Sequence, residues 1–124
     1  NNNSDASYGA TYTTGDIIGC ALDLTNGAIY FSKNGAWQNS ATTSEIAAGT
    51  TTNAAYTSIS SSYVYLPAVQ IYGSGTNQFN AGNGFFGTTA VSSVQNPSSG
   101  DTSAEFEYTP PTGFQPITTK GLNE

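Results

Sequence analysis

The sequence predicts an all-β protein, an antiparallel β-sandwich, and three observations favour this fold class. Charged residues make up 8% of the 124 residues, whereas glycine, serine, threonine, asparagine and tyrosine are common, a composition that favours strands and turns over helices. Apolar residues alternate along the stretch from Gly15 to Gln38, as in half-buried strands. The same stretch holds two Asn-Gly pairs, which are strong signals for hairpin turns. The chain length fits one domain.

The first hairpin is predicted from the alternation that begins at Ile18 and from the pair Asn26-Gly27. A two-residue type I′ turn at this pair places Thr25 opposite Ala28 and Leu22 opposite Phe31 on one face. We therefore expect Leu22 and Phe31 to be buried cross-strand neighbours. Two further side chains, those of Asp23 and Tyr30, are expected on the other face.

The second Asn-Gly pair, Asn34-Gly35, predicts a second tight turn directly after the first hairpin. In that register Trp37 lies opposite Ser32, on the face away from Leu22. The chain would therefore continue as a third antiparallel strand.

The rest of the chain alternates between predicted loops and strands. Residues 38–62, rich in alanine, threonine and serine, are predicted to form a long loop or weak edge strands. The run from Tyr63 to Tyr72 is a strand candidate in which Pro67 favours an edge or a bulge. Residues 88–103 are a loop by composition, and the alternating residues 105–108 predict a last strand.

Charge and composition exclude several classes of function. The net charge is −6, and Lys33 and Lys120 are the only cations, so the chain has no basic surface for phosphates and we expect no nucleic-acid partner. Histidine is absent, which removes the usual proton shuttle of enzymes. The single Cys20 cannot form an intramolecular disulfide and is expected to be buried. No apolar run is long enough to span a bilayer, so no membrane insertion is expected.

The carboxylates are interpreted as structural. Asp16 and Asp23 fall on opposite strand faces, without the carboxylate spacing of a calcium loop. Glu105 and Glu107 share one strand face and could in principle act as an acid and a base across a sugar, but neighbouring charges on a solvent-facing edge also discourage aggregation. We therefore expect no catalytic residues, no metal and no cofactor, and a protein that is not an enzyme.

Four stretches, GDIIGCALDLTNGAIYFSKNG, YLPAVQIY, FNAG and FEYTPPTGFQPI, together resemble the second half of a SPRY domain. The likeness runs from Tyr8 to Asn123, and its order and spacing matter more than any single motif. The residues that match the family's pattern are Gly15, Asp16, Gly19, Leu22, Asp23, Phe31, Lys33, Asn34, Gly35, Leu66 to Val69, Asn80 to Gly82, Pro110, Pro111, Gly113 and Phe114.

The resemblance implies a SPRY-like, concanavalin-like jelly roll of two bent antiparallel sheets. We expect residues 1–124 to be a single domain, incomplete at its N-terminal side because the family's opening strands are missing, and part of a longer chain. Such a chain, expressed alone, should be unstable or should associate, since the face of Leu22 and Phe31 would lack a cover.

The resemblance also implies a non-catalytic binding module. The Ser/Thr/Asn-rich texture is similar to SPRY-type modules of bacteriophage virion proteins, such as tail fibres, so we expect a virion component, a homo-oligomer in its assembly, that presents loops to a host-surface protein or glycan. The alternative is a structural or decoration element that contacts neighbouring virion subunits. The binding residues expected from their aromatic faces are Trp37, Tyr63, Tyr65, Phe85 and Phe86. Recognition by these side chains should vary little with salt.

Overall fold

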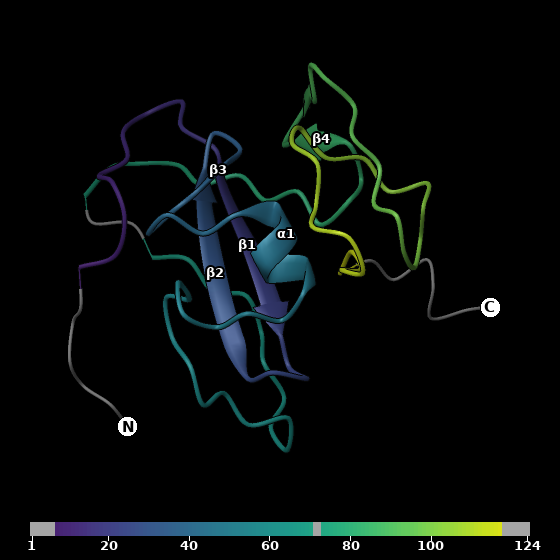
Figure 1. The fold of residues 1–124 in the computed structure, drawn as a ribbon. Coiled ribbons are helices and arrows are strands. Elements are labelled where there is room, and N and C mark those ends of the chain that lie inside the picture. Colours follow the sequence, from purple (N-terminus) through teal and green to yellow (C-terminus); the bar gives the residue numbers. More distant parts are fainter. Residues whose placement is uncertain (1–6, 71–72, 118–124) are drawn as a thin grey trace. The chain divides into compact units, whose positions relative to one another are not determined.

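A computed structural model describes residues 7–70 and 73–117, in two units, residues 1–59 and residues 60–124 (Figure 1). The first unit holds β1 (Ile18–Asp23), β2 (Ala28–Lys33), β3 (Ala36–Trp37) and the helix α1 (Thr43–Ala47). The second unit holds β4 (Phe85–Phe86) and β5 (Thr89–Ala90). Strands dominate the regular structure and all the named strands pair antiparallel, which agrees with the predicted all-β class.

The hairpin of β1 and β2 has a longer loop than predicted. Asp23 pairs with Ala28, and Leu22 pairs with Ile29, so residues 24–27 form a four-residue loop. The prediction of a two-residue turn at this position is therefore wrong. The physical reason is the Asp23 carboxylate, which accepts hydrogen bonds from the backbone N (2.9 Å) and Nδ2 (2.7 Å) of Asn26 and so stabilises a wider turn.

The register therefore differs from the predicted one by two residues, and this change preserves the faces. Phe31 pairs with Cys20 instead of Leu22, but Leu22 and Phe31 still share one face of the sheet, because side chains alternate with a period of two. Asp23 and Tyr30 lie on the other face, as predicted.

The second turn is confirmed as predicted. Lys33 pairs with Ala36, and Ser32 pairs with Trp37, which leaves only Asn34 and Gly35 in the turn. Their φ values are 49° and 80°, the left-handed backbone that a type I′ turn requires at both central positions.

The core of the first unit lies on the face opposite to the predicted one. Tyr30 is fully buried, at 0% exposure, together with Ala21, Ala28 and Ser32 on the same face. By contrast, Leu22 and Phe31 are only half-buried, so the expectation that they form the buried core was wrong. Residues that follow β3 contact the Tyr30 face: Tyr30 Oη donates a hydrogen bond of 2.7 Å to Thr50 O, and Glu45 of α1 lies near enough to contribute to the raised pKa of Tyr30, of which desolvation by burial is the main cause.

The helix α1 lies within the segment predicted to be loop or weak strand. Thr42 caps its first turn: Thr42 Oγ1 accepts from Glu45 N at 3.2 Å, and the Glu45 carboxylate accepts from Thr42 N at 2.9 Å. Ile46, its buried residue, is 1% exposed. This reciprocal capping box stabilises a helix too short to show an apolar period.

Cys20 is exposed on the half-buried face of the sheet, which corrects the expectation that it is buried. It stands opposite Phe31, and surrounding atoms still desolvate the thiol enough to raise its pKa above the ordinary value. Cys20 therefore lies on the face of the sheet that residues 38–59 do not cover.

The second unit has little regular structure. Residues 63–70 form no strand and are exposed, so the predicted strand is wrong there, while Ile71 and Tyr72 lie outside the described residues. The predicted strand 105–108 is reduced to single bridges, in which Glu105 pairs with Asn83, and Phe106 with Gln95. The buried apolar residues that the structure describes in this unit are Val91, Pro97, Ala104 and Pro111. Within the described ranges 7–70 and 73–117, no helix is long and apolar enough to cross a membrane.

Candidate functional site

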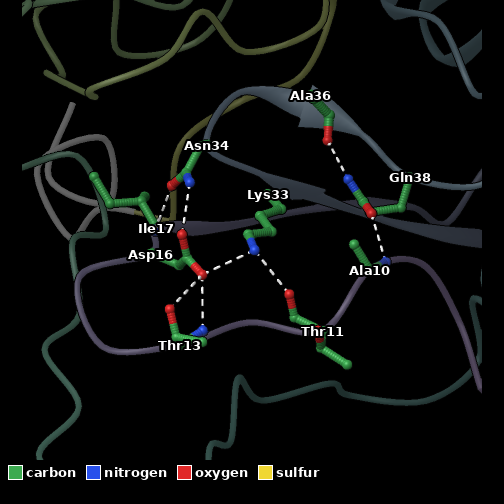
Figure 2. Close-up of polar contacts among 9 residues, drawn as sticks. All are labelled: Ala10, Thr11, Thr13, Asp16, Ile17, Lys33, Asn34, Ala36 and Gln38. Atoms are coloured by element: carbon green, nitrogen blue, oxygen red, sulfur yellow. Dashed lines mark hydrogen bonds and ion pairs between the residues drawn. The ribbon is translucent and has the colours of Figure 1, made fainter.

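Asp16 is the centre of a polar cluster that joins the chain before β1 to the turn between β2 and β3 (Figure 2). Its Oδ2 accepts a hydrogen bond of 2.7 Å from Thr13 N and lies 3.0 Å from Lys33 Nζ. Its Oδ1 accepts a hydrogen bond of 2.7 Å from Asn34 Nδ2. One carboxylate thus connects a turn, a strand end and a hairpin.

Asn34 completes the cluster from the other side. Its Oδ1 accepts from Ile17 N at 2.8 Å, and its backbone N donates to Ile17 O at 2.8 Å. The turn residue therefore pairs with Ile17 much as a strand residue would. This explains why an asparagine in left-handed backbone, rather than a second glycine, suits the position.

Two more side chains hold the segment before Asp16 along its length. Lys33 Nζ donates to Thr11 O at 2.7 Å, and Gln38 Oε1 accepts from Ala10 N at 2.8 Å. At the beginning of the segment, Tyr8 Oη donates to Asn53 O at 3.1 Å, and its ring meets that of Phe31 edge to face at 6.2 Å. We call residues 8–17 the clamped loop.

The charges of the cluster are mutually satisfied. Hydrogen bonding from Thr13 N, then from Lys33 and Asn34, holds the pKa of Asp16 well below its usual range, so this carboxylate stays ionised at neutral pH. Lys33 supplies the opposite charge and, with Lys120 outside the described residues, is one of the chain's two cations. Neither group is free to act as a general acid or base.

The clamped loop displays one large side chain to solvent. Tyr12, at 70% exposure, lies between the anchored residues Thr11 and Thr13. Sequence reasoning missed Tyr12, although an aromatic residue just before the Gly15-Asp16 motif was an available signal. A fixed backbone on either side of an exposed tyrosine is suited to binding, because the loop is already ordered.

The five residues predicted to bind fall in both units. Trp37 is half-buried in β3 of the first unit. In the second unit, Tyr63 is 70% and Tyr65 40% exposed, and Tyr65 Oη donates to Ser60 O at 2.9 Å. Phe85, at 44% exposure, and half-buried Phe86 are adjacent in β4.

The two acidic residues that were weighed as a catalytic pair have separate structural contacts. The Glu107 carboxylate accepts from Ser92 N at 2.6 Å and also from Ser92 Oγ, and these bonds lower the pKa of Glu107. The Glu105 side chain packs against Gly84, where an added Cβ would lie 2.4 Å from Glu105 Oε2. Within the described residues, no group of three or more histidine, cysteine, aspartate or glutamate side chains is placed to hold a metal ion.

Comparison with known proteins identifies a family for most of the chain. The SPRY domain model matches residues 1–84. Among curated proteins, the dual specificity protein kinase splA of Dictyostelium discoideum is 49% identical over 39 residues, which are 32% of this chain and 2% of that protein. Ran-binding protein 9 is 54% identical over 28 residues, 23% of this chain, in both Danio rerio and Homo sapiens.

The matched segments are a small part of these relatives. They cover 5% of Ran-binding protein 9 of Danio rerio and 4% of that of Homo sapiens. No solved structure matches the chain significantly.

Proposed function

Because the chain belongs to the SPRY domain family, we propose that it is a protein-binding module and that the clamped loop forms part of its contact surface. SPRY domains bind proteins, and relatives include Ran-binding proteins. The observation that carries the proposal for this surface is Tyr12, 70% exposed on a loop whose backbone is held at Ala10, Thr11 and Thr13.

The physical argument concerns the entropy lost on binding. A mobile loop must be ordered when a partner binds, at a cost of about 0.5–1.5 kcal/mol for each immobilised side chain. The bonds from Asp16, Lys33 and Gln38 order this loop in advance. Tyrosine adds a large apolar surface with a hydroxyl at its tip, which is why it is enriched at interfaces.

The second unit offers further candidate contact residues, namely Tyr63, Tyr65 and Phe85, which are among its exposed aromatic residues. They are supported by exposure alone, without a clamp of the kind seen at Asp16. We keep Trp37 and Phe86 as weaker candidates because both are half-buried in strands.

The finer proposal is a binding module of a bacteriophage virion appendage, such as a tail fibre, that recognises a protein or glycan on the host surface. Its support is the Ser/Thr/Asn-rich texture of the chain; the relatives named above are eukaryotic. A location in the virion and a homo-oligomeric assembly belong to this proposal. The alternative within it is a structural or decoration element that contacts neighbouring virion subunits.

A random peptide library and a glycan array, both probed with the full chain, test the proposal. We expect enriched peptides, whose binding Tyr12→Ala weakens about tenfold or more, as for a residue at the centre of an interface. Tyr56→Ala is the matched control, since Tyr56 is 50% exposed in the same unit but outside the clamped loop. Peptides that bind both variants equally would exclude the loop, and enrichment on the glycan array alone would exclude protein binding as the principal activity.

A further inference from the structure

Three Asn-Gly pairs occur in the described chain, at Asn26, Asn34 and Asn83. The backbone N of a following glycine is unhindered because glycine has no side chain, and it can attack Cγ of the asparagine. The N–Cγ bond forms, the Cγ–Nδ2 bond breaks, and Nδ2 leaves as ammonia with the proton of the glycine N–H. Water then opens the succinimide ring at either carbonyl, which yields aspartate or isoaspartate.

The three pairs differ in how firmly the asparagine side chain is held. The amide of Asn34 is bound at both atoms, by Ile17 N at 2.8 Å and by Asp16 Oδ1 at 2.7 Å. Both bonds must break before Cγ can turn toward the nitrogen of Gly35. The pair also lies in the type I′ turn of the three-stranded sheet, so the backbone resists the required rotation.

Asn26 is held at one side-chain atom. Its Nδ2 donates to Asp23 Oδ2 at 2.7 Å. Its amide also packs closely against Gly49, where an added Cβ would lie 2.3 Å from Nδ2. The side chain of Asn26 is therefore less restrained than that of Asn34 and more restrained than that of Asn83.

Asn83 is the least restrained of the three. It is exposed, its Oδ1 accepts only a long bond of 3.4 Å from Phe85 N, and its Nδ2 has no hydrogen-bond partner among the described residues. Its backbone belongs to a single bridge with Glu105 rather than to a continuous sheet, although its neighbours Gly82 and Gly84 each accept a backbone hydrogen bond of 2.9 Å, from Glu105 N and Val91 N. Isolated bridges open locally at low free-energy cost.

We propose that Asn83-Gly84 is a modification site at which the native chain deamidates spontaneously, and that the bonds of the Asp16 cluster protect Asn34-Gly35. Conversion of Asn83 adds a negative charge beside Glu105, its bridge partner. The isoaspartate product also lengthens the backbone directly before β4, the strand of Phe85 and Phe86. Ageing of the protein would thus first alter the second unit.

Incubation of the full chain at mildly alkaline pH, followed by peptide mapping that separates aspartate from isoaspartate, tests the proposal. Because both side-chain hydrogen bonds of Asn34 must break first, we expect Asn83 to convert about fivefold or more faster than Asn34 in the native protein. In urea the three pairs should convert at rates within a few-fold of one another. Asn83→Gln should remove the first acidic species that appears.

Two matched variants separate protection by hydrogen bonds from global unfolding. Asp16→Ala should speed conversion of Asn34 alone, and Asp23→Ala should speed conversion of Asn26 alone, because each removes the acceptor of that asparagine's Nδ2. Acceleration of both sites by either variant would mean that the first unit unfolds as a whole, and would overturn the role of the individual bonds. If Asn34 or Asn26 deamidates in the native protein at least as fast as Asn83, the proposal that Asn83-Gly84 is the modification site is wrong.

Discussion

Asn34 Nδ2 donates a hydrogen bond of 2.7 Å to Asp16 Oδ1, and so connects the turn between β2 and β3 with the chain that leads into β1. Both residues belong to the stretches that resemble the SPRY family, as does Lys33, the third member of the cluster. Their contacts hold a loop in place. The conspicuous polar residues of the sequence therefore hold the backbone on either side of Tyr12.

Asn34→Ala should destabilise the first unit by about 2–4 kcal/mol. Two side-chain hydrogen bonds are lost, each contributing about 0.5–1.5 kcal/mol, and alanine in left-handed backbone costs about 1 kcal/mol more. Urea unfolding followed by fluorescence measures the effect, because Trp37 is the single tryptophan and lies in this unit.

Asn34→Gly separates the two contributions to that loss. Glycine accepts the φ of 49° without strain, so this variant should lose only the hydrogen-bond part, about 1 kcal/mol less than the alanine variant. Equal stability of the glycine variant and the natural protein would show that the bonds to Asp16 and Ile17 contribute nothing.

The stability of the first unit should fall in acid because of Asp16. Its pKa is lowered in the folded state, so its contribution is fully present above the ordinary value of about 3.9 and is lost as the pH falls from there toward the lowered folded pKa. Urea midpoints by Trp37 fluorescence from neutral pH to below pH 3 or so measure this loss. Asp16→Asn, which cannot titrate, should show a distinctly weaker decline; an identical decline would assign the acid sensitivity to other carboxylates.

The sequence predicted those parts of the fold that depend on short-range patterns. The turn at Asn34-Gly35, the position of Trp37 opposite Ser32 and the faces of Leu22 and Tyr30 follow from turn chemistry and a period of two. The loop at residues 24–27 was mispredicted because the Asp23 carboxylate competes for Asn26, a side-chain effect that the Asn-Gly signal does not contain.

Predictions that depend on which chain segment covers a surface failed. The apolar alternation marked Leu22 and Phe31 as core, but the buried side chains lie on the Tyr30 face, where Tyr30 Oη donates to Thr50 O. Strand preference predicted a strand at residues 63–70. A strand also needs a neighbouring strand to pair with, and strand preference does not contain that information. For the candidate site, aromatic content identified exposed residues such as Tyr63. The only sequence signal for Tyr12 was its place shortly before Gly15-Asp16, and the contacts of Asp16 and Lys33 are what distinguish it from other tyrosines.

A matched pair of glycine variants tests the packing around the first hairpin loop. Gly27 and Gly15 both have positive φ, 66° and 91°, so alanine at either position costs about 1–2 kcal/mol of backbone strain. At Gly27 the added Cβ would also lie 2.8 Å from Ile59 O, while at Gly15 it meets nothing within 4 Å. Gly27→Ala should therefore lower the urea midpoint clearly more than Gly15→Ala. Equal effects of the two substitutions would contradict the close packing of Ile59 against Gly27.

Thr42→Ala should destabilise α1, since Thr42 provides the cap that accepts from Glu45 N at 3.2 Å. Removal of such a cap costs about 1 kcal/mol. Thr42→Ser keeps the hydroxyl and is the control, with a midpoint near that of the natural protein. If both variants unfold alike, the capping box does not stabilise this five-residue helix.

Tyr30 tests whether the buried face is the one opposite to Leu22. Its ring is 0% exposed and its hydroxyl donates to Thr50 O at 2.7 Å. Tyr30→Phe should cost about 1 kcal/mol, because it removes one hydrogen bond and leaves the ring in place. Tyr30→Leu should cost more, about 2–4 kcal/mol, because it also leaves a cavity where the ring was buried. Cys20→Ala, on the open face, should change the urea midpoint by less than either. A larger loss of stability from Cys20→Ala than from Tyr30→Leu would indicate that the core lies on the face of Leu22 and Phe31.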